Sequence, residues 1–314
     1  MRFPSATGLA FALMGAFCFG VVTPLVQLAA APLGTFTTSA LLCAGAATFA
    51  LFTTAFQGTD PPVQLWHAPR LLVVALLGSV CAPALLVYGL ARTNGVEACL
   101  LMNCESVFTA ALGLVILRER LGWRFVFGVS AITVGAMFLM GESAANSQSE
   151  TIGLVAIAAS TFAWALDNVL ARQLAECDPA EVVFGKCTIG ALVCAAIALA
   201  TEPVPESRTA LAAVFLCGVF GYGATERMYL LSQRYIGVAR TSSVFGVAPF
   251  FGAVVALAIG APIGFVWVGA GCLMAIGVMI HATESAPAPA DDPLPEPELA
   301  VNPAAIDPEH RVAR

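Results

Sequence analysis

An acidic side chain interrupts one of the most apolar stretches of this sequence. Glu105 lies near the middle of the apolar run 95–117, with Met102 before it and Thr109 after it at helical spacing. A charge at the bilayer centre costs about 2.5–3.5 kcal/mol on insertion scales, so such a residue should face a cavity or a partner. Glu105 is therefore our first candidate for binding a substrate or a proton, followed by Asn103, Asp167, Asn168 and Trp164. The alternative is a glutamate that hydrogen-bonds a neighbouring helix and has only a packing role.

A second group of polar residues comes from two consecutive apolar runs. Asp167 and Asn168 lie late in one run, and Lys186 lies early in the next, so the two charges fall at similar depth. This placement predicts an ion pair between Asp167 and Lys186, acting as a structural lock or as a gate. The alternative is that Lys186 extends its amine to the membrane surface. Trp164 and Tyr222 are candidates for lining a cavity that stacks planar substrates, although aromatic residues in a helical bundle often serve only packing.

A third group lies towards the end of the apolar run 209–233. Glu226 and Arg227 are adjacent there, and Arg234 and Arg240 follow within a few turns. We expect Glu226 and Arg227 to join an interfacial network with Arg234 or Arg240. A structural role is favoured for this network, with a gating role as the alternative.

No motif in the chain indicates a metal, a cofactor or a nucleotide. The ten cysteines form no CxxC pair and have no zinc-like spacing with the three histidines. The sequence contains no GxxxxGK[ST], HExxH or GxSxG motif, which argues against an ATP-driven pump and against a hydrolase. A net charge of −6 with a single lysine excludes nucleic acid as an expected partner.

The elements that hold these residues must be membrane helices. Hydrophobic residues make up 59% of the 314 residues and charged residues only 11%, whereas soluble domains carry about 25% charged residues. A span needs about 20 mainly apolar residues. Ten runs qualify: 7–28, 33–56, 70–91, 95–117, 122–141, 151–171, 180–201, 209–233, 237–260 and 264–283. The expected fold is an all-α membrane protein with ten transmembrane helices.

Cationic residues predict the orientation of these helices. With the N-terminus inside the cell, one side receives Arg2, Arg70, Arg118, Arg120, Arg124, Arg172, Lys186, Arg234 and Arg240, and the other only Arg92 and Arg208. Both termini are therefore expected in the cytoplasm of a multi-pass inner-membrane protein. Residues 284–314 are rich in proline and acidic residues, which predicts a disordered cytoplasmic tail.

The two halves of the chain resemble each other. Residues 7–141 and 151–283 each hold five runs, and an odd number of spans places the second repeat in the opposite orientation. The matched landmarks are Gly8-Leu9 with Gly153-Leu154, Phe19 with Trp164, and Leu77-Gly78 with Cys217-Gly218. Pro24, Pro83 and Pro249 lie inside expected spans and predict kinks there.

Several short segments resemble a known family. They are Glu105-Ser106-Val107-Phe108-Thr109, Leu117-Arg118-Glu119-Arg120-Leu121 with Gly128 and Gly135, and Ala248-Pro249-Phe250 in the second repeat, where the glutamate is absent. In this order they resemble the EamA-type branch of the drug/metabolite transporter superfamily, over residues 7–283. The resemblance implies ten helices and the export or exchange of small metabolites.

These observations together predict a secondary-active transporter. We expect it to move a small polar organic metabolite, such as an amino acid, by alternating access, in efflux or exchange. The cavity is expected between the two repeats near the membrane midplane. The partners are the substrate and the lipid bilayer, while proton coupling and a homodimer are left open. The alternative is a membrane-embedded enzyme or accessory protein without transport activity.

Overall fold

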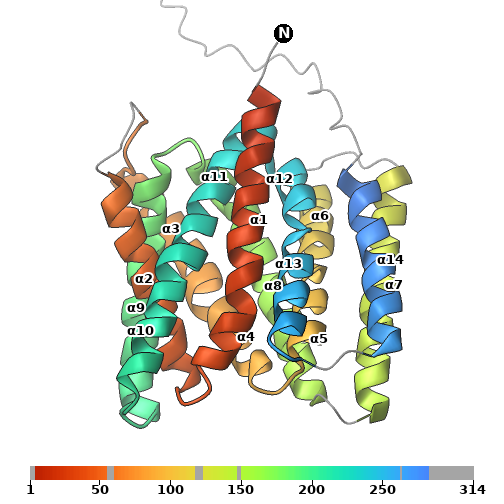
Figure 1. Ribbon diagram of the computed structural model, residues 1–314. Coiled ribbons are helices and arrows are strands. Elements are labelled where there is room, and N and C mark those ends of the chain that lie inside the picture. Colours follow the sequence, from red (N-terminus) through yellow and green to blue (C-terminus); the bar gives the residue numbers. More distant parts are fainter. Residues whose placement is uncertain (1–3, 55–59, 117–122, 147–149, 262–263, 283–314) are drawn as a thin grey trace, which may run out of the picture.

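The computed structural model describes residues 4–54, 60–116, 123–146, 150–261 and 264–282, and these residues form helices without strands (Figure 1). The first half contains α1 (Pro4–Ala29), α2 (Thr35–Thr54), α3 (Ala68–Val74), α4 (Ala82–Leu90), α5 (Gly95–Leu101), α6 (Cys104–Ile116) and α7 (Trp123–Asn146). The second half contains α8 (Thr151–Ala171), α9 (Pro179–Thr201), α10 (Arg208–Cys217), α11 (Ala224–Ile236), α12 (Val238–Phe245), α13 (Ala248–Ala258) and α14 (Phe265–Ala282). The predicted tail, 284–314, and the turn 117–121 lie outside the described residues.

The helices are long and apolar enough for a bilayer. Seven stretches of the described chain meet the length and hydropathy expected of a span: Ala6–Ala29, Thr35–Thr54, Leu65–Leu90, Gly95–Gly113, Thr151–Leu174, Pro179–Thr201 and Arg208–Ile236. Three shorter apolar helices cover Val126–Phe138, Ala248–Ala258 and Phe265–Ile280. An all-helical, multi-pass membrane architecture is therefore confirmed, while the number of ten crossings stays a prediction.

The third run of each half contains a π-helical segment. Ala75–Cys81 joins α3 to α4, and Gly218–Gly223 joins α10 to α11. Pro83 lies in the first turn of α4, directly after the first of these segments, where the sequence predicted a kink. A π-helix pairs each N–H with the carbonyl five residues back, so the segment releases carbonyl groups for other partners.

The fourth run of each half is broken, whereas the sequence predicted continuous helices. The first break falls between α5 and α6 at Met102 and Asn103, and the second between α12 and α13 at Gly246 and Val247. Pro249, in the first turn of α13, has no N–H to continue the preceding helix. Met102 therefore lies in the break just before the helix that carries Glu105, and the continuous helix predicted over these residues is interrupted there.

Helix packing follows the same plan in both halves. α2 packs along α9 and α7 packs along α14, while α1 contacts α11 and α13, and α8 contacts α4 and α6 (Figure 1). Exchanging the two halves maps the contacts of α1 onto those of α8, whereas the α2–α9 and α7–α14 contacts each join equivalent helices. Gly45 of α2 lies against the backbone near the second π-helical segment, and Gly190 of α9 lies against Ser79 in the first. A Cβ at either glycine would collide with the neighbouring backbone, so these contacts require glycine.

Candidate functional site

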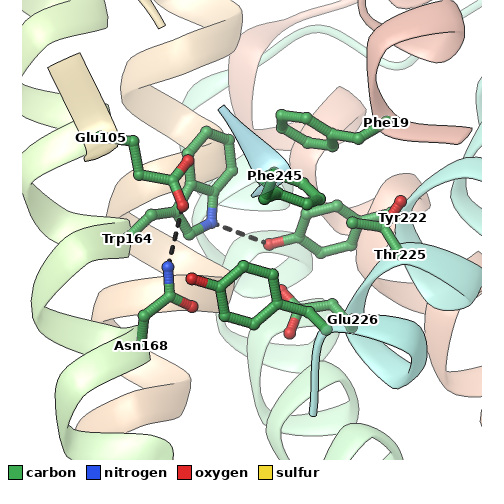
Figure 2. Close-up of a pocket in the computed structure, with 9 residues that line it drawn as sticks. Phe19, Glu105, Trp164, Asn168, Tyr222, Thr225, Glu226 and Phe245 are labelled. Carbon is green, nitrogen blue, oxygen red and sulfur yellow. Dashed lines mark hydrogen bonds between the residues drawn. The ribbon is translucent and has the colours of Figure 1, made fainter. Parts of the chain in front are cut away.

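A cavity of about 320 Å³ lies where helices of both halves converge (Figure 2). Its walls come from α1, α6, α8, α11, α12 and the second π-helical segment. The lining residues are Phe19, Glu105, Trp164, Asn168, Tyr222, Thr225, Glu226, Tyr229 and Phe245. We call this space the polar cavity. Five of its residues were site candidates from the sequence, namely Glu105, Trp164, Asn168, Tyr222 and Glu226.

Glu105 lies in the first turn of α6 and reaches the polar cavity. Its side chain is buried, and its Oε1 accepts a hydrogen bond of 2.8 Å from Asn168 Nδ2 across the cavity wall (Figure 2). The N-terminal position suits a carboxylate, because the helix dipole is positive there. The same contact also joins the two repeats, since α6 belongs to the first and α8 to the second.

Asn103, the other candidate in this run, is not among the residues that line the polar cavity. It lies in the break before α6, where its Nδ2 donates to Leu100 O at 3.1 Å. Leu100 O also accepts the backbone N–H of Asn103 at 3.1 Å, so this residue holds the carbonyl at the break through both its backbone and its side chain. Thr109, one turn after Glu105, is buried, and its hydroxyl has no partner among the described residues.

Lys186 lies between two carboxylates. Its Nζ is 2.6 Å from Asp167 Oδ2 and 3.0 Å from Glu226 Oε2. The contact expected between Asp167 and Lys186 is present, and the alternative of an amine at the membrane surface is not, because only 2% of each of these side chains is exposed. The network draws on α8, α9 and α11. Asp167 fits beside Gly78, where any Cβ would collide with its carboxylate.

Sequence reasoning assigned Glu226 to a different network. Arg227 donates instead to Thr53 O at 3.4 Å, and Arg234 binds Asp60 Oδ2 at 2.8 Å and Cys177 O at 2.7 Å. Successive residues point about 100° apart on a helix, so Glu226 faces Lys186 while Arg227 faces the end of α2. Arg240 lies on α12, but its side chain is outside the described residues.

Two aromatic side chains of the polar cavity share one backbone acceptor. Tyr222 OH donates to Gly78 O at 2.6 Å, and Trp164 Nε1 donates to the same oxygen at 3.1 Å. In an α-helix Gly78 O would accept from the N–H of Ala82, four residues on, and in a π-helix from that of residue 83. The N–H of Ala82 bonds Leu77 O instead, and Pro83 has no N–H, so Gly78 O is available to side chains. The π-helical segment of the first repeat therefore fixes two aromatic side chains of the second.

A second cavity, of about 360 Å³, lies beyond these aromatic side chains. It is lined by Phe19, Val22, Thr23, Val26, Leu42, Pro83, Leu86, Leu90, Trp164 and Tyr222. We call it the apolar cavity. Phe19, Trp164 and Tyr222 line both cavities and so form an aromatic partition between them. Sequence reasoning did not select Phe19 as a site residue, although its repeat match with Trp164 was a usable signal.

The comparisons with known proteins decide the family. Residues 6–141 match the EamA-like transporter family, and residues 151–283 match it again. The chain belongs to the EamA-like transporter family. The two matches agree with the repeats predicted from the sequence and with the paired helix breaks of the fold.

Relatives within this family are named as transporters. An "Uncharacterized transporter" of Methanothermobacter thermautotrophicus is 30% identical over 60% of this chain, and the chain spans only 57% of that protein. The "Uncharacterized transporter YyaM" of Bacillus subtilis is 24% identical over 68% of this chain and 72% of its own length. A "Probable amino-acid metabolite efflux pump" of Salmonella typhimurium is 25% identical over 31% of this chain and 32% of its own length.

A solved crystal structure shares the fold. It superposes with a TM-score of 0.68 over 86% of this chain and 95% of that chain, at 19% sequence identity. At this level of identity the likeness concerns the fold alone. The EamA-like chain therefore shares its architecture with a solved protein. The chemistry of its candidate site depends on its own residues.

Proposed function

We propose that this protein is a secondary-active transporter that moves a small polar organic metabolite, such as an amino acid, by efflux or exchange. The observation that carries the proposal is the polar cavity, which holds the buried Glu105 between helices of both repeats. A buried carboxylate facing a cavity can bind a substrate or a proton. The Salmonella relative, named as a probable efflux pump, supports outward movement.

Alternating access is the proposed mechanism. The polar and apolar cavities lie on opposite sides of the aromatic partition, and neither π-helical segment has the regular hydrogen bonding of an α-helix. Inverted repeats and discontinuous helices near the substrate site are common features of secondary transporters. In the proposed cycle, the two halves rock against each other and open one cavity at a time.

The proposed topology has ten spans, with both termini in the cytoplasm of an inner-membrane protein. Arginine placement supports this orientation. Lys186 does not belong in that argument, because its amine is buried with Asp167 and Glu226. The remaining cationic residues still favour the same side. In this orientation the chain would present the polar cavity towards the cytoplasm and the apolar cavity towards the outside.

A flux screen tests the proposed function. The purified protein is reconstituted into liposomes, and uptake and counterflow are measured for a library of amino acids and vitamins. We expect flux of at least one polar metabolite above that of protein-free liposomes. Failure of every compound with folded protein would favour the alternative, a membrane enzyme or accessory protein that carries out no transport.

Glu105→Gln tests the role of the carboxylate. Glutamine has nearly the same size and can still accept the hydrogen bond from Asn168, but it cannot carry a proton or a charge. We expect flux driven by an imposed pH gradient to be lost while the protein stays folded. Glu150→Gln removes an acid that is largely exposed, outside both cavities, and serves as the matched control. Normal transport by Glu105→Gln with unchanged pH dependence would overturn this role.

A further inference from the structure

We infer that the polar cavity binds an organic cation, a protonated amine joined to an apolar or aromatic body and carrying no carboxylate. The inference rests on the proposed function and names its substrate class. The inferred substrate class includes amines but excludes zwitterionic amino acids, which carry the same ammonium group together with a carboxylate. The charges, the hydrogen-bonding groups and the aromatic walls of the cavity support it independently.

The first argument is the balance of charge around the cavity. Glu105 and Glu226 line it directly, and neither arginine nor lysine is among the described residues that do so. Behind this wall, Lys186 is held between Asp167 and Glu226, so one ammonium serves two carboxylates. Two carboxylates around one ammonium already leave an excess of negative charge in a buried space, and Glu105 adds to it whenever it gives up its proton. A cation entering the cavity would relieve this excess, whereas a substrate carboxylate would add to it.

The second argument concerns groups that could hold an anion. A helix that begins inside the membrane commonly offers free N–H groups to an anionic substrate. At α6 these groups are already used, because Glu105 N bonds Met102 O and Ser106 N bonds Asn103 O, each at 3.1 Å. At α13 the N–H of Phe250 is likewise bonded to Val247 O. The broken helices therefore offer no donors at these positions to a substrate carboxylate.

The third argument is the aromatic wall. Phe19 contacts Trp164 with ring centroids 5.5 Å apart and Phe245 at 5.7 Å, and Tyr229 contacts Phe245 at 5.1 Å. These rings form a continuous surface around the space beside the two glutamates. The faces of aromatic rings attract ammonium groups, and their area suits an apolar body.

The acceptors around the cavity suit an ammonium group. Tyr229 lines the polar cavity, only 5% of the residue is exposed, and Ser242 and Gln233 lie beside its OH. An ammonium group has three N–H donors and no acceptor. Glu105, Glu226 and Tyr229 OH together offer the acceptors that such a group needs.

Four ligands with one phenyl body distinguish the charge patterns. Phenylalanine is a zwitterion, phenylalaninamide and phenethylamine are cations, and 3-phenylpropionate is an anion. Binding to the full-length purified protein is measured by calorimetry in detergent at pH 6, where the amino groups of all three amines are protonated. We expect both cations to bind at least about tenfold more tightly than phenylalanine, because the carboxylate of phenylalanine adds a negative charge beside the two glutamates. No binding of 3-phenylpropionate is expected.

Variants locate the binding to the polar cavity. Glu105→Gln and Glu226→Gln are each expected to weaken phenylalaninamide binding by about tenfold or more. Glu150→Gln, which removes a carboxylate outside both cavities, should bind phenylalaninamide as the unchanged protein does. Because Glu226→Gln removes a partner of Lys186, thermal unfolding of each variant is measured first, and Glu105→Gln provides the test if Glu226→Gln does not fold.

The outcomes separate this inference from the proposed function. Phenylalanine binding as tightly as its amide, or cation binding that neither glutamine variant weakens, would overturn the inference, and so would absence of cation binding. Transport of an amino acid in the flux screen would then leave the proposed function intact. Conversely, selective cation binding without flux of phenylalaninamide, phenethylamine or any compound of the screen would support the inference and count against transport.

Discussion

The polar cavity and the apolar cavity share the side chains of Phe19, Trp164 and Tyr222, but the rest of their walls differ in chemistry. Carboxylates, an amide and hydroxyls line the first, whereas aliphatic side chains, a proline and one threonine line the second. Both cavities use α1, α8 and the second π-helical segment, but α6, α11 and α12 complete the polar cavity, whereas α2 and α4 complete the apolar one. Charged groups therefore occur beside only one of the two cavities.

Equivalent positions show how this difference arises. Val22 and Asp167 each lie three residues after a matched aromatic residue, Phe19 or Trp164. Asp167 packs against Gly78 in the first π-helical segment, and Val22 packs against Gly221 in the second. One repeat thus places an aliphatic side chain where the other places a carboxylate. In the proposed cycle, one side closes by apolar packing and the other by ion pairs, so the two closed states would respond differently to charge.

A second pair of equivalent positions gives the largest expected effect. Lys186 and Leu41 each lie four residues before a glycine that packs on a π-helical segment, Gly190 or Gly45. Lys186→Met would leave Asp167 and Glu226 buried together without a cation. We expect a loss of about 3–5 kcal/mol in stability, as for other broken buried ion pairs. Thermal unfolding in detergent measures it, and transport is expected to be abolished.

Leu41→Met is the matched control for Lys186→Met. It introduces the same side chain at the equivalent position of the first repeat, where a hydrophobic exchange of similar volume costs less than about 1.5 kcal/mol. Equal losses of stability in the two variants would show that Lys186 contributes by packing. The charge of Lys186 would then contribute no more to stability than the aliphatic side chain of Leu41 at the equivalent position of the first repeat.

Charge exchange tests whether the contact itself matters for function. Asp167→Lys and Lys186→Asp each place like charges within the buried network, and we expect either change alone to abolish flux. Combining them restores opposite charges at the two positions, although Glu226 then faces an aspartate at residue 186 in place of its lysine partner. We expect partial recovery of flux, measured in proteoliposomes. A double variant no more active than the single variants would exclude a functional pair.

The membrane helices, the internal repeat and part of the candidate site could be predicted from the sequence. Apolar runs identified the membrane helices because a bilayer requires long stretches of helix with few charges. Glu105 and Asp167 were recognisable because burial of a charge in lipid is costly, and few charges lie deep in the runs. The repeat was visible in matched residues such as Phe19 and Trp164.

What the sequence could not provide depends on local hydrogen bonding and on rotation about the helix axis. The breaks before α6 and α13 are shorter than one helical turn, so hydropathy continues across them. Glu226 and Arg227 are adjacent in the chain, and only the orientation of α11 determines which of them meets Lys186.

The smallest expected effect concerns the partition that the two cavities share. Tyr222→Phe and Trp164→Phe each remove one donor to Gly78 O and also the 3.3 Å hydrogen bond from Trp164 Nε1 to Tyr222 OH, while the other donor to Gly78 O remains. We expect each hydrogen-bond loss to cost about 1 kcal/mol, with an added packing cost for the smaller ring of Trp164→Phe. The double variant leaves Gly78 O with neither donor, but the bond between the two side chains is lost only once, so its loss of stability should be at least the sum of the single losses. Thermal unfolding measures this cycle, with Tyr235→Phe as an exposed control. A double loss smaller than the sum would mean that Gly78 O finds another partner, and that the π-helical segment does not hold the partition in place.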